Sequence, residues 1–208
     1  MNSTTLDVGR FTLDNSWVIG INGIRTSRWE AWEHATTMHE RAGVVIVHFI
    51  HNASHGIFLD VVECILLRMG IETPATRMLR EGLEWCANFI GPDDKIFLPC
   101  HSAGGSHAKL ALTNSSQEVR DKVIALSIAS AEIIPRELCF DAFNYASKRD
   151  FVTRTDIAGM SKYGDQLILL DPHPDAPFFD HGFNSPTFTE VIEYHTQEYI
   201  KKYWKDNK

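Results

Sequence analysis

The sequence lacks the features of several specialised classes of protein. Its 208 residues contain no apolar run as long as a transmembrane helix, and residues 1–13 are polar, without the apolar core of a signal peptide. An excess of basic side chains is missing too, since the net charge is −7. These absences argue against a membrane-spanning protein and against a nucleic-acid-binding protein, which needs a basic face.

Cysteine is scarce, and its spacing is uninformative for metal or redox chemistry. The four cysteines are Cys64, Cys86, Cys100 and Cys139, and no two of them form a C-x-x-C pair. This pattern favours free thiols in a reducing compartment, and therefore a cytoplasmic protein. Secretion through a signal that specialised machinery reads remains the alternative.

Short apolar runs alternate with helix-like segments along the chain, and no repeat, linker or low-complexity tract interrupts them. Strands are predicted at 16–21, 43–49, 95–99, 122–130, 141–147 and 166–170, and helices at 28–42, 58–69, 76–90, 107–113 and 185–204. A β-branched run such as 43–49 is typical of a strand buried on both faces of a parallel sheet. The pattern predicts a single domain, 1–208, with a three-layer, doubly wound, mostly parallel α/β fold.

The most informative run, 95–106, combines an apolar strand, a turn with Ser102 at its tip and a glycine pair. This layout is typical of a nucleophile elbow, which holds a serine at the exposed crest of a strand-to-helix turn. The usual pattern is G-x-S-x-G, and here it reads Cys-His-Ser-Ala-Gly at 100–104. Small neighbours are needed because the serine backbone is strained. Ser102 is therefore the predicted nucleophile, with Cys100 as a small substitute for the first glycine.

A serine nucleophile needs a histidine as base and a carboxylate that orients the imidazole. In elbow-type enzymes the acid and then the histidine follow the serine along the chain. Asp150 lies just beyond a predicted strand and is the favoured acid, ahead of Asp156 and Asp171. Two histidines follow the last predicted strand. His181, in a loop with a glycine, is the favoured base, and His173, which two prolines restrict, is the alternative base.

The reaction also needs an oxyanion hole for the negative oxygen of the tetrahedral intermediate. One donor is expected to be the backbone N–H of Ala103, directly after the nucleophile. The other is expected from the loop after the first predicted strand, where Asn22 and Gly23 stand. Gly23 allows the backbone to turn inward, so that the N–H of Ile24, or that of Gly23 itself, faces the oxyanion. The other interpretation of this pair is a plain Asn-Gly turn.

Together these motifs resemble the lipase-like branch of the α/β-hydrolase superfamily, and the resemblance spans nearly the whole chain. They are Asn-Gly at 22–23, Cys-His-Ser-Ala-Gly-Gly at 100–105, Asp-Phe-Val at 150–152 and Asp-His-Gly-Phe at 180–183. The chain departs from the pattern at Cys100, where glycine is usual, and at Asn22, where many lipases have histidine.

A narrower resemblance is to a chlamydial family of hydrolase-like proteins, and it implies no particular substrate. The motifs that carry it are Ile-Asn-Gly-Ile at 21–24, His-Gly at 55–56, Cys-His-Ser at 100–102, Pro-His-Pro at 172–174, Asp-His at 180–181 and Ser-Pro-Thr at 185–187.

Three histidines, His48, His51 and His55, invite a metal interpretation. Their spacing suits one face of a helix, whereas His48 ends a predicted strand and the other two follow in a loop. No second group of Asp, Glu or Cys at ligand spacing accompanies them. We therefore predict no metal site, and no cofactor, because a serine triad needs none.

The order of these motifs, each at a predicted strand end, predicts a serine hydrolase that cleaves an ester or thioester through an acyl-enzyme. Residues 131–140 are too few to insert a large lid between neighbouring strands. An open site suits accessible esters or acyl groups, on a small molecule or a macromolecule. The alternative is a hydrolase fold with a misplaced triad that acts as a binding or scaffold protein.

Overall fold

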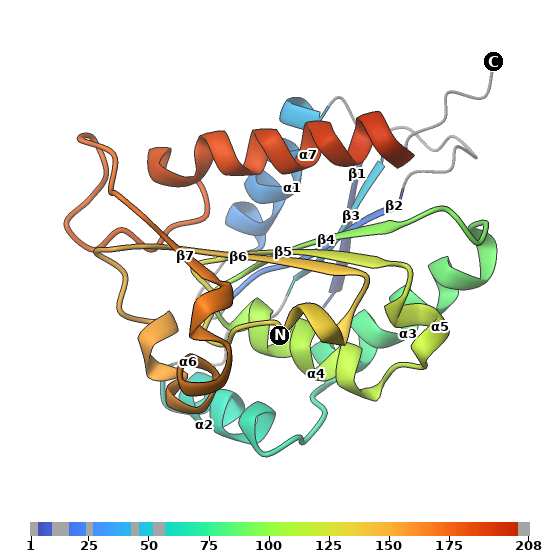
Figure 1. Cartoon of the computed structure of the whole chain (residues 1–208), viewed down its shortest axis with the longest axis horizontal. Helices are drawn as coiled ribbons and strands as arrows, with labels where there is room; N and C mark the ends of the chain where they lie inside the picture. Colours follow the sequence, from blue (N-terminus) through green and yellow to red (C-terminus); the bar gives the residue numbers. More distant parts are fainter. Residues whose placement is uncertain (1–3, 10–16, 24–26, 43–45, 52–56, 204–208) are drawn as a thin grey trace.

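The computed structural model describes residues 4–9, 17–23, 27–42, 46–51 and 57–203 (Figure 1). Within this part of the chain, one seven-stranded sheet has the order β1-β3-β2-β4-β5-β6-β7. The strands are β1 (Thr4–Gly9), β2 (Trp17–Ile21), β3 (Ile46–His51), β4 (Ile96–His101), β5 (Val123–Ile128), β6 (Asp141–Ser147) and β7 (Leu167–Leu170). Strands β2 to β7 pair in parallel, and β1 pairs antiparallel with β3 at one edge.

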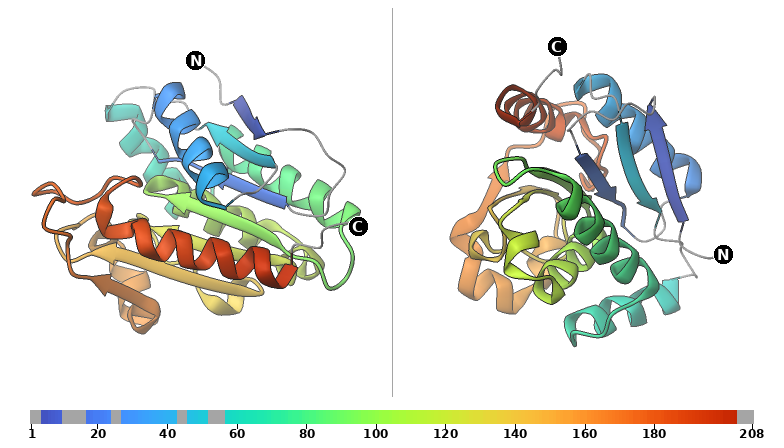
Figure 2. Two further views of the ribbon diagram at one scale, coloured as in Figure 1. Left: turned by 90° about the horizontal axis from the view of Figure 1, so that it is seen from above. Right: turned by 90° about the vertical axis from the view of Figure 1, so that its right-hand side faces the viewer.

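Helices cover both faces of this sheet (Figures 1 and 2). One face carries α1 (Arg28–Ala42) and α7 (Thr189–Tyr203). The opposite face carries α2 (Ile57–Arg68), α3 (Pro74–Phe89), α4 (Ala103–Asn114), α5 (Gln117–Arg120) and α6 (Ile157–Tyr163). The predicted three-layer, doubly wound, mostly parallel α/β fold is confirmed. Among the described residues, none of the helices has the length and apolar character needed to span a bilayer.

The central strand β4 contributes to the core on both faces of the sheet. Ile96 and Leu98 are buried in the cluster beneath α3 and α4, which also contains Leu83. Phe97, between them, points to the other face, where its ring stacks on that of Tyr199 from α7 at 5.1 Å between centroids. Because successive side chains of a strand point to opposite faces, a continuous apolar run is what a strand covered on both sides requires.

The structure differs from the sequence-based expectation most clearly at β1, at α6 and at the start of α4, and the short helix α5 was not expected either. Strand β1 was not expected, because its sequence, Thr-Thr-Leu-Asp-Val-Gly, has few apolar residues and it occupies an edge. Helix α6 was not expected either; it is seven residues long and begins at Ile157, and the side chain of the preceding Asp156 caps it by accepting from the N–H of Gly159. Helix α4 begins at Ala103 and so includes the glycine pair, four residues earlier than its composition suggested.

The order of the strands creates a switch point between β2 and β4. From β2 the chain first moves to β3 on one side and later to β4 on the other. At such a point the loops after the two strands separate to opposite faces and leave a crevice at their carboxyl ends. The connection from β5 to β6 contains only the short turn η1 (Arg136–Leu138), so that connection holds no large lid, as expected.

Candidate active site

Ser102 lies at the junction of β4 and α4 with an unusual backbone conformation. Its φ is 55° and its ψ is −127°, a combination that residues other than glycine rarely adopt. The strain is held by the surrounding backbone, because the Ser102 N–H donates to the carbonyl of Ile128 and the Ser102 carbonyl accepts from the N–H of Ala131. This is the geometry of a nucleophile elbow, with the serine side chain lifted out of the strand.

The glycines around Ser102 are required by close backbone approach. A Cβ on Gly104 would lie 2.5 Å from the carbonyl oxygen of Ile21, at the end of β2. A Cβ on Gly105 would lie 2.4 Å from Cβ of Ser130, after β5. The first turn of α4 therefore packs directly against the ends of both neighbouring strands, with no room for a side chain.

Cys100 occupies the place of the usual first glycine without disturbing the elbow. It is the fifth residue of β4, 1% exposed, and its thiol donates to the carbonyl of Leu126 at 3.7 Å. Burial raises the pKa of the Cys100 thiol to about 12. A thiol that stays protonated and points into the core is a packing group, which agrees with its interpretation as a small substitute.

Ser102, His181 and Asp150 form one continuous chain of hydrogen bonds. The hydroxyl of Ser102 lies 2.9 Å from Nε2 of His181, and Nδ1 of His181 lies 2.9 Å from Oδ2 of Asp150. Asp150 is 1% exposed, and its other oxygen accepts from the N–H of Val152 at 2.8 Å. Both oxygens of this buried carboxylate are thereby satisfied. The three residues come from the loops after β4, β7 and β6, at the carboxyl edge of the sheet.

His101, to which the sequence analysis assigned no role, is buried and holds the loop of His181 through a hydrogen bond. Its Nε2–H donates to the backbone carbonyl of His181 at 2.7 Å. Burial first, and then the neighbouring imidazoles of His181 and His34, lower the pKa of His101 to about 3. His101 is therefore neutral near pH 7, with its proton on the nitrogen that makes this bond. The residue before the nucleophile thus positions the residue that pairs with it.

Asp180 anchors the same loop through its side chain, a role that sequence reasoning did not assign to it. Its two oxygens accept from the hydroxyls of Ser185 and Thr187, each at 2.5 Å. Burial alone would raise the pKa of Asp180, but the hydroxyl groups of Ser185, Thr187 and Ser147 outweigh it and hold that pKa below its usual value. The sequence signals were the Asp-His motif at 180–181 and the Ser-Pro-Thr motif at 185–187, to which no role was assigned.

The other candidates lie elsewhere. His173 is half exposed; its ring Nδ1 accepts from the N–H of Asp175, and its own N–H donates to Thr187. Asp156 is committed to capping α6 and to the N–H of Ile133. Asp171 is exposed and pairs with Lys148 at 2.6 Å. None of these three groups joins the hydrogen-bonded chain from Ser102 to Asp150.

Two of the three expected oxyanion donors lie in the described part of the chain. Ala103 is the first residue of α4, so its N–H belongs to the helix turn that has no intrahelical acceptor and carries a partial positive charge. Gly23 is buried directly against Ser102, since a Cβ there would lie 2.9 Å from the Ser102 hydroxyl oxygen. Ile24 lies outside the described residues.

The histidine group near β3 is only partly described. His51 is buried at the end of β3, whereas the side chain of His48 and all of His55 lie outside the described part. Within the described residues, no three His, Cys, Asp or Glu side chains gather in a way suited to a metal ion.

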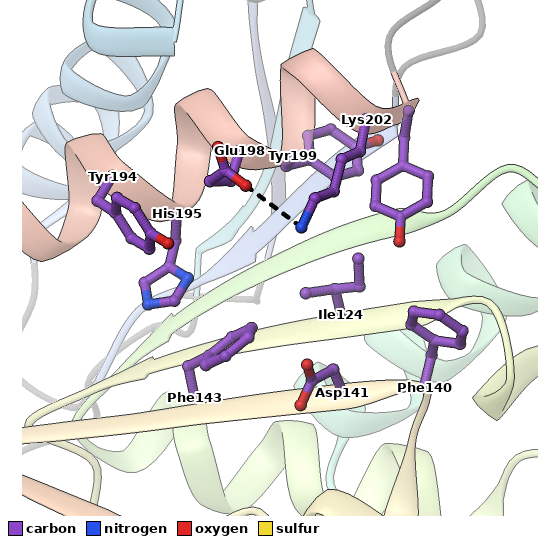
Figure 3. A pocket seen from close by; sticks show the side chains of 10 residues that line it. Ile124, Phe140, Asp141, Phe143, Tyr194, His195, Glu198, Tyr199 and Lys202 are labelled. Carbon is purple, nitrogen blue, oxygen red and sulfur yellow. Dashed lines mark ion pairs between the residues drawn. The ribbon is translucent and has the colours of Figure 1, made fainter.

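A separate hollow lies between α7 and the strands β5 and β6 (Figure 3). His195 and the ion pair between Glu198 and Lys202, at 3.2 Å, line it from α7, and Asp141 lines it from the sheet. Asp141 begins β6, whereas Asp150 follows the other end of that strand. This hollow therefore lies toward the amino ends of the strands, whereas Ser102 lies at their carboxyl ends.

Comparison with known proteins gives a structural likeness without a sequence match. No protein-family model matches the chain, and no curated protein matches it. An arylesterase structure aligns over 96% of this chain and 85% of its own, with a TM-score of 0.59 and 11% identity. A dienelactone hydrolase from Anabaena variabilis aligns over 98% and 93%, with a TM-score of 0.55 and 14% identity. A Pyrobaculum calidifontis esterase aligns over 96% and 85%, with a TM-score of 0.56 and 10% identity.

Proposed function

We propose that this chain, which has the α/β-hydrolase fold, is a serine hydrolase that cleaves an ester or thioester. The observation that carries the proposal is the hydrogen-bonded chain Ser102–His181–Asp150, with 2.9 Å at each link and the serine on a strained elbow. The names of the structural neighbours, which include an arylesterase and other esterases, support the same class of reaction. We treat residues 1–208 as one catalytic domain, because one sheet carries all three groups.

In the proposed reaction, Ser102 Oγ attacks the carbonyl carbon while Nε2 of His181 takes the hydroxyl proton. Asp150 holds the proton on Nδ1 and stabilises the imidazolium that forms. The carbonyl oxygen, now negative, accepts from the N–H of Ala103 and from the Gly23–Ile24 backbone. The bond to the leaving oxygen or sulfur then breaks, and that atom takes the proton from His181. Water repeats the sequence on the acyl-enzyme and releases the acid.

The direct test is labelling with a fluorophosphonate probe, which reacts only with an activated serine. The wild-type protein should be labelled, and Ser102→Ala should not be, while Ser161→Ala, on the exposed side of α6, should label as the wild type does. Ester hydrolysis should fall by about 10⁴-fold or more in Ser102→Ala. Folded wild-type protein that resists the probe would instead support the binding or scaffold alternative.

Three finer expectations remain predictions from the sequence. They are the kinship with the chlamydial hydrolase-like family, which rests on its motifs, the cytoplasmic location, which rests on the cysteine pattern, and the absence of nucleic acid among the partners, which rests on the charge.

A further inference from the structure

Two exposed phenylalanines stand together beside the imidazole of His181. Phe151 follows Asp150 directly, and Phe179 lies two residues before His181. Their rings stack at 4.7 Å between centroids with an interplanar angle of 27°. The exposed fractions are 63% for Phe151 and 42% for Phe179. We call this pair the aromatic ledge.

The aromatic ledge is continuous with the imidazole of His181. The ring of Phe179 is nearly parallel to that imidazole, at 8°, with 5.3 Å between centroids. The imidazole also contacts the ring of His101, at 5.0 Å, but His101 is buried. Within the described part of the chain, Phe179 and Phe151 therefore form an exposed apolar surface next to the His181 imidazole, while the buried His101 lies on its inner side.

Both halves of the aromatic ledge are held in place by the same contacts that fix the triad. The backbone at Phe151 is fixed between Asp150 and Val152, whose N–H donates to the Asp150 carboxylate. The backbone at Phe179 precedes Asp180, which is anchored by two hydroxyl groups. An apolar surface that is exposed and yet preorganised loses little entropy when it binds a ligand.

We propose that the aromatic ledge binds the apolar alcohol or thiol portion of the substrate, so that the preferred substrates are esters of aromatic or bulky apolar alcohols. The inference rests on the proposed function. When the acyl–oxygen bond breaks, the electron pair stays on the leaving oxygen, and the proton on Nε2 of His181 passes to that oxygen. The leaving oxygen must therefore lie within hydrogen-bond reach of His181. Its substituent then lies beside Phe179, whereas the acyl group, bonded to Ser102, lies on the side of the oxyanion donors.

The test compares benzyl acetate with methyl acetate, which share the acyl group and differ in the apolar alcohol. The wild-type protein should have the higher kcat/KM for benzyl acetate. In Phe151→Ala the ratio of the two kcat/KM values should fall about threefold to tenfold, as expected for one lost aromatic contact. Phe179→Leu should lower the same ratio. Phe89→Ala is the matched control, because Phe89 is an exposed aromatic residue on α3 whose ring contacts that of Trp85 at 4.7 Å between centroids. It should leave the ratio unchanged.

A second pair of esters places the aromatic ledge on one side of the scissile bond. Methyl benzoate and methyl acetate vary the acyl group, and their ratio should not respond to Phe151→Ala. A change in this ratio, or an unchanged benzyl-to-methyl ratio in variants that still hydrolyse both acetates, overturns the proposal. Failure of the proposed function looks different: the wild-type protein then hydrolyses none of the esters and Ser102 resists the fluorophosphonate probe, and the proposal for the aromatic ledge falls with it.

Discussion

Single side chains in this molecule link parts of the chain that are distant in sequence. His101 precedes the proposed nucleophile and donates to the carbonyl of His181, 80 positions further on. Asp180, the residue directly before His181, accepts hydrogen bonds from the hydroxyls of Ser185 and Thr187. The hydrogen bonds of both side chains go to other groups of the protein, and both hold the loop that carries the imidazole of His181. They are positioning residues, because a catalytic imidazole that is displaced by a fraction of an ångström loses its alignment with the serine.

The role of His101 can be separated from simple packing by two substitutions. His101→Leu removes the donor to His181 and should lower kcat for an activated acetate ester about fivefold, because a net hydrogen bond contributes about 1 kcal/mol. The KM should change little. His101→Gln places an amide N–H near the position of the ring Nε2 and should restore most of the lost kcat. Equal losses in both variants, following their thermal stability alone, would contradict the positioning role.

At the scale of the element, the close packing of α4 against the sheet depends on glycines, which have no side chain, in its first turn. Its first turn presses against the ends of β2 and β5, and the glycines there leave no space for a Cβ. The helix therefore begins at Ala103, despite the low helix propensity of two consecutive glycines, because tertiary contact outweighs propensity. Helix α3 contains a glycine of the opposite kind: a Cβ on Gly82 would meet its nearest neighbour, Cδ1 of Ile19, only at 4.0 Å.

Alanine at these two glycines should have effects of opposite sign on the free energy of unfolding. Gly104→Ala forces a Cβ against the backbone carbonyl of Ile21, which cannot rotate away, and should lower that free energy by about 1–3 kcal/mol. Gly82→Ala adds a helix-favouring methyl that meets Ile19 only at ordinary van der Waals distance, and it should raise the free energy of unfolding by about 0.5–1 kcal/mol. Urea unfolding of both variants measures the difference. A neutral or stabilising Gly104→Ala would show that the elbow helix does not pack as closely as described.

At the scale of the whole molecule, the fold buries several histidines in their neutral form. Burial lowers the pKa of His34 to about 4 and that of His107 to about 3, and His101 has a pKa of about 3 as well. The unfolded chain binds protons at all three with a pKa near 6.5. Below about pH 6.5 the unfolded state therefore holds more protons than the native state, and the stability of the protein must fall as the pH falls.

The expected result is a steep loss of stability between about pH 6.5 and pH 4. At pH 4.5, two units below the unfolded pKa, each of these buried histidines costs on the order of 3 kcal/mol, and together they approach the whole stability of a typical domain. Urea midpoints at pH 7, 5.5 and 4.5 measure the slope. In His107→Asn the amide oxygen takes the place of Nδ1, which lies 2.8 Å from Oγ1 of Thr76. This variant should flatten the slope by up to about 1.4 kcal/mol per pH unit, even if its stability at pH 7 is lower. An unchanged slope would mean that His107, which also lies 3.9 Å from Glu63, is not the group that titrates.

The sequence by itself determined the layers of the fold and most of its elements. Runs such as 96–98 and 123–126 are apolar without interruption, and only a strand covered on both faces requires that pattern. The same reasoning named Ser102, Asp150 and His181 as candidates, because a serine, an acid and a histidine each followed a predicted strand, in a fixed order along the chain. Edge strand β1 and helix α6 escaped it, since a short mixed segment has no clear period and gains its structure from its neighbours.

Only the tertiary structure decided which histidine meets Ser102 and what holds it there. His173 and His181 stand in the same loop and have similar local signals, but only His181 lies within hydrogen-bond distance of Ser102. The neighbouring Asp180 is held by the hydroxyls of Ser185 and Thr187. The contact between Phe179 and His181 depends on how that loop closes over the end of the sheet, and its pairing with Phe151 joins two separate loops. Local patterns encode the period and burial of a segment, whereas the meeting of distant loops depends on the packing of the whole chain.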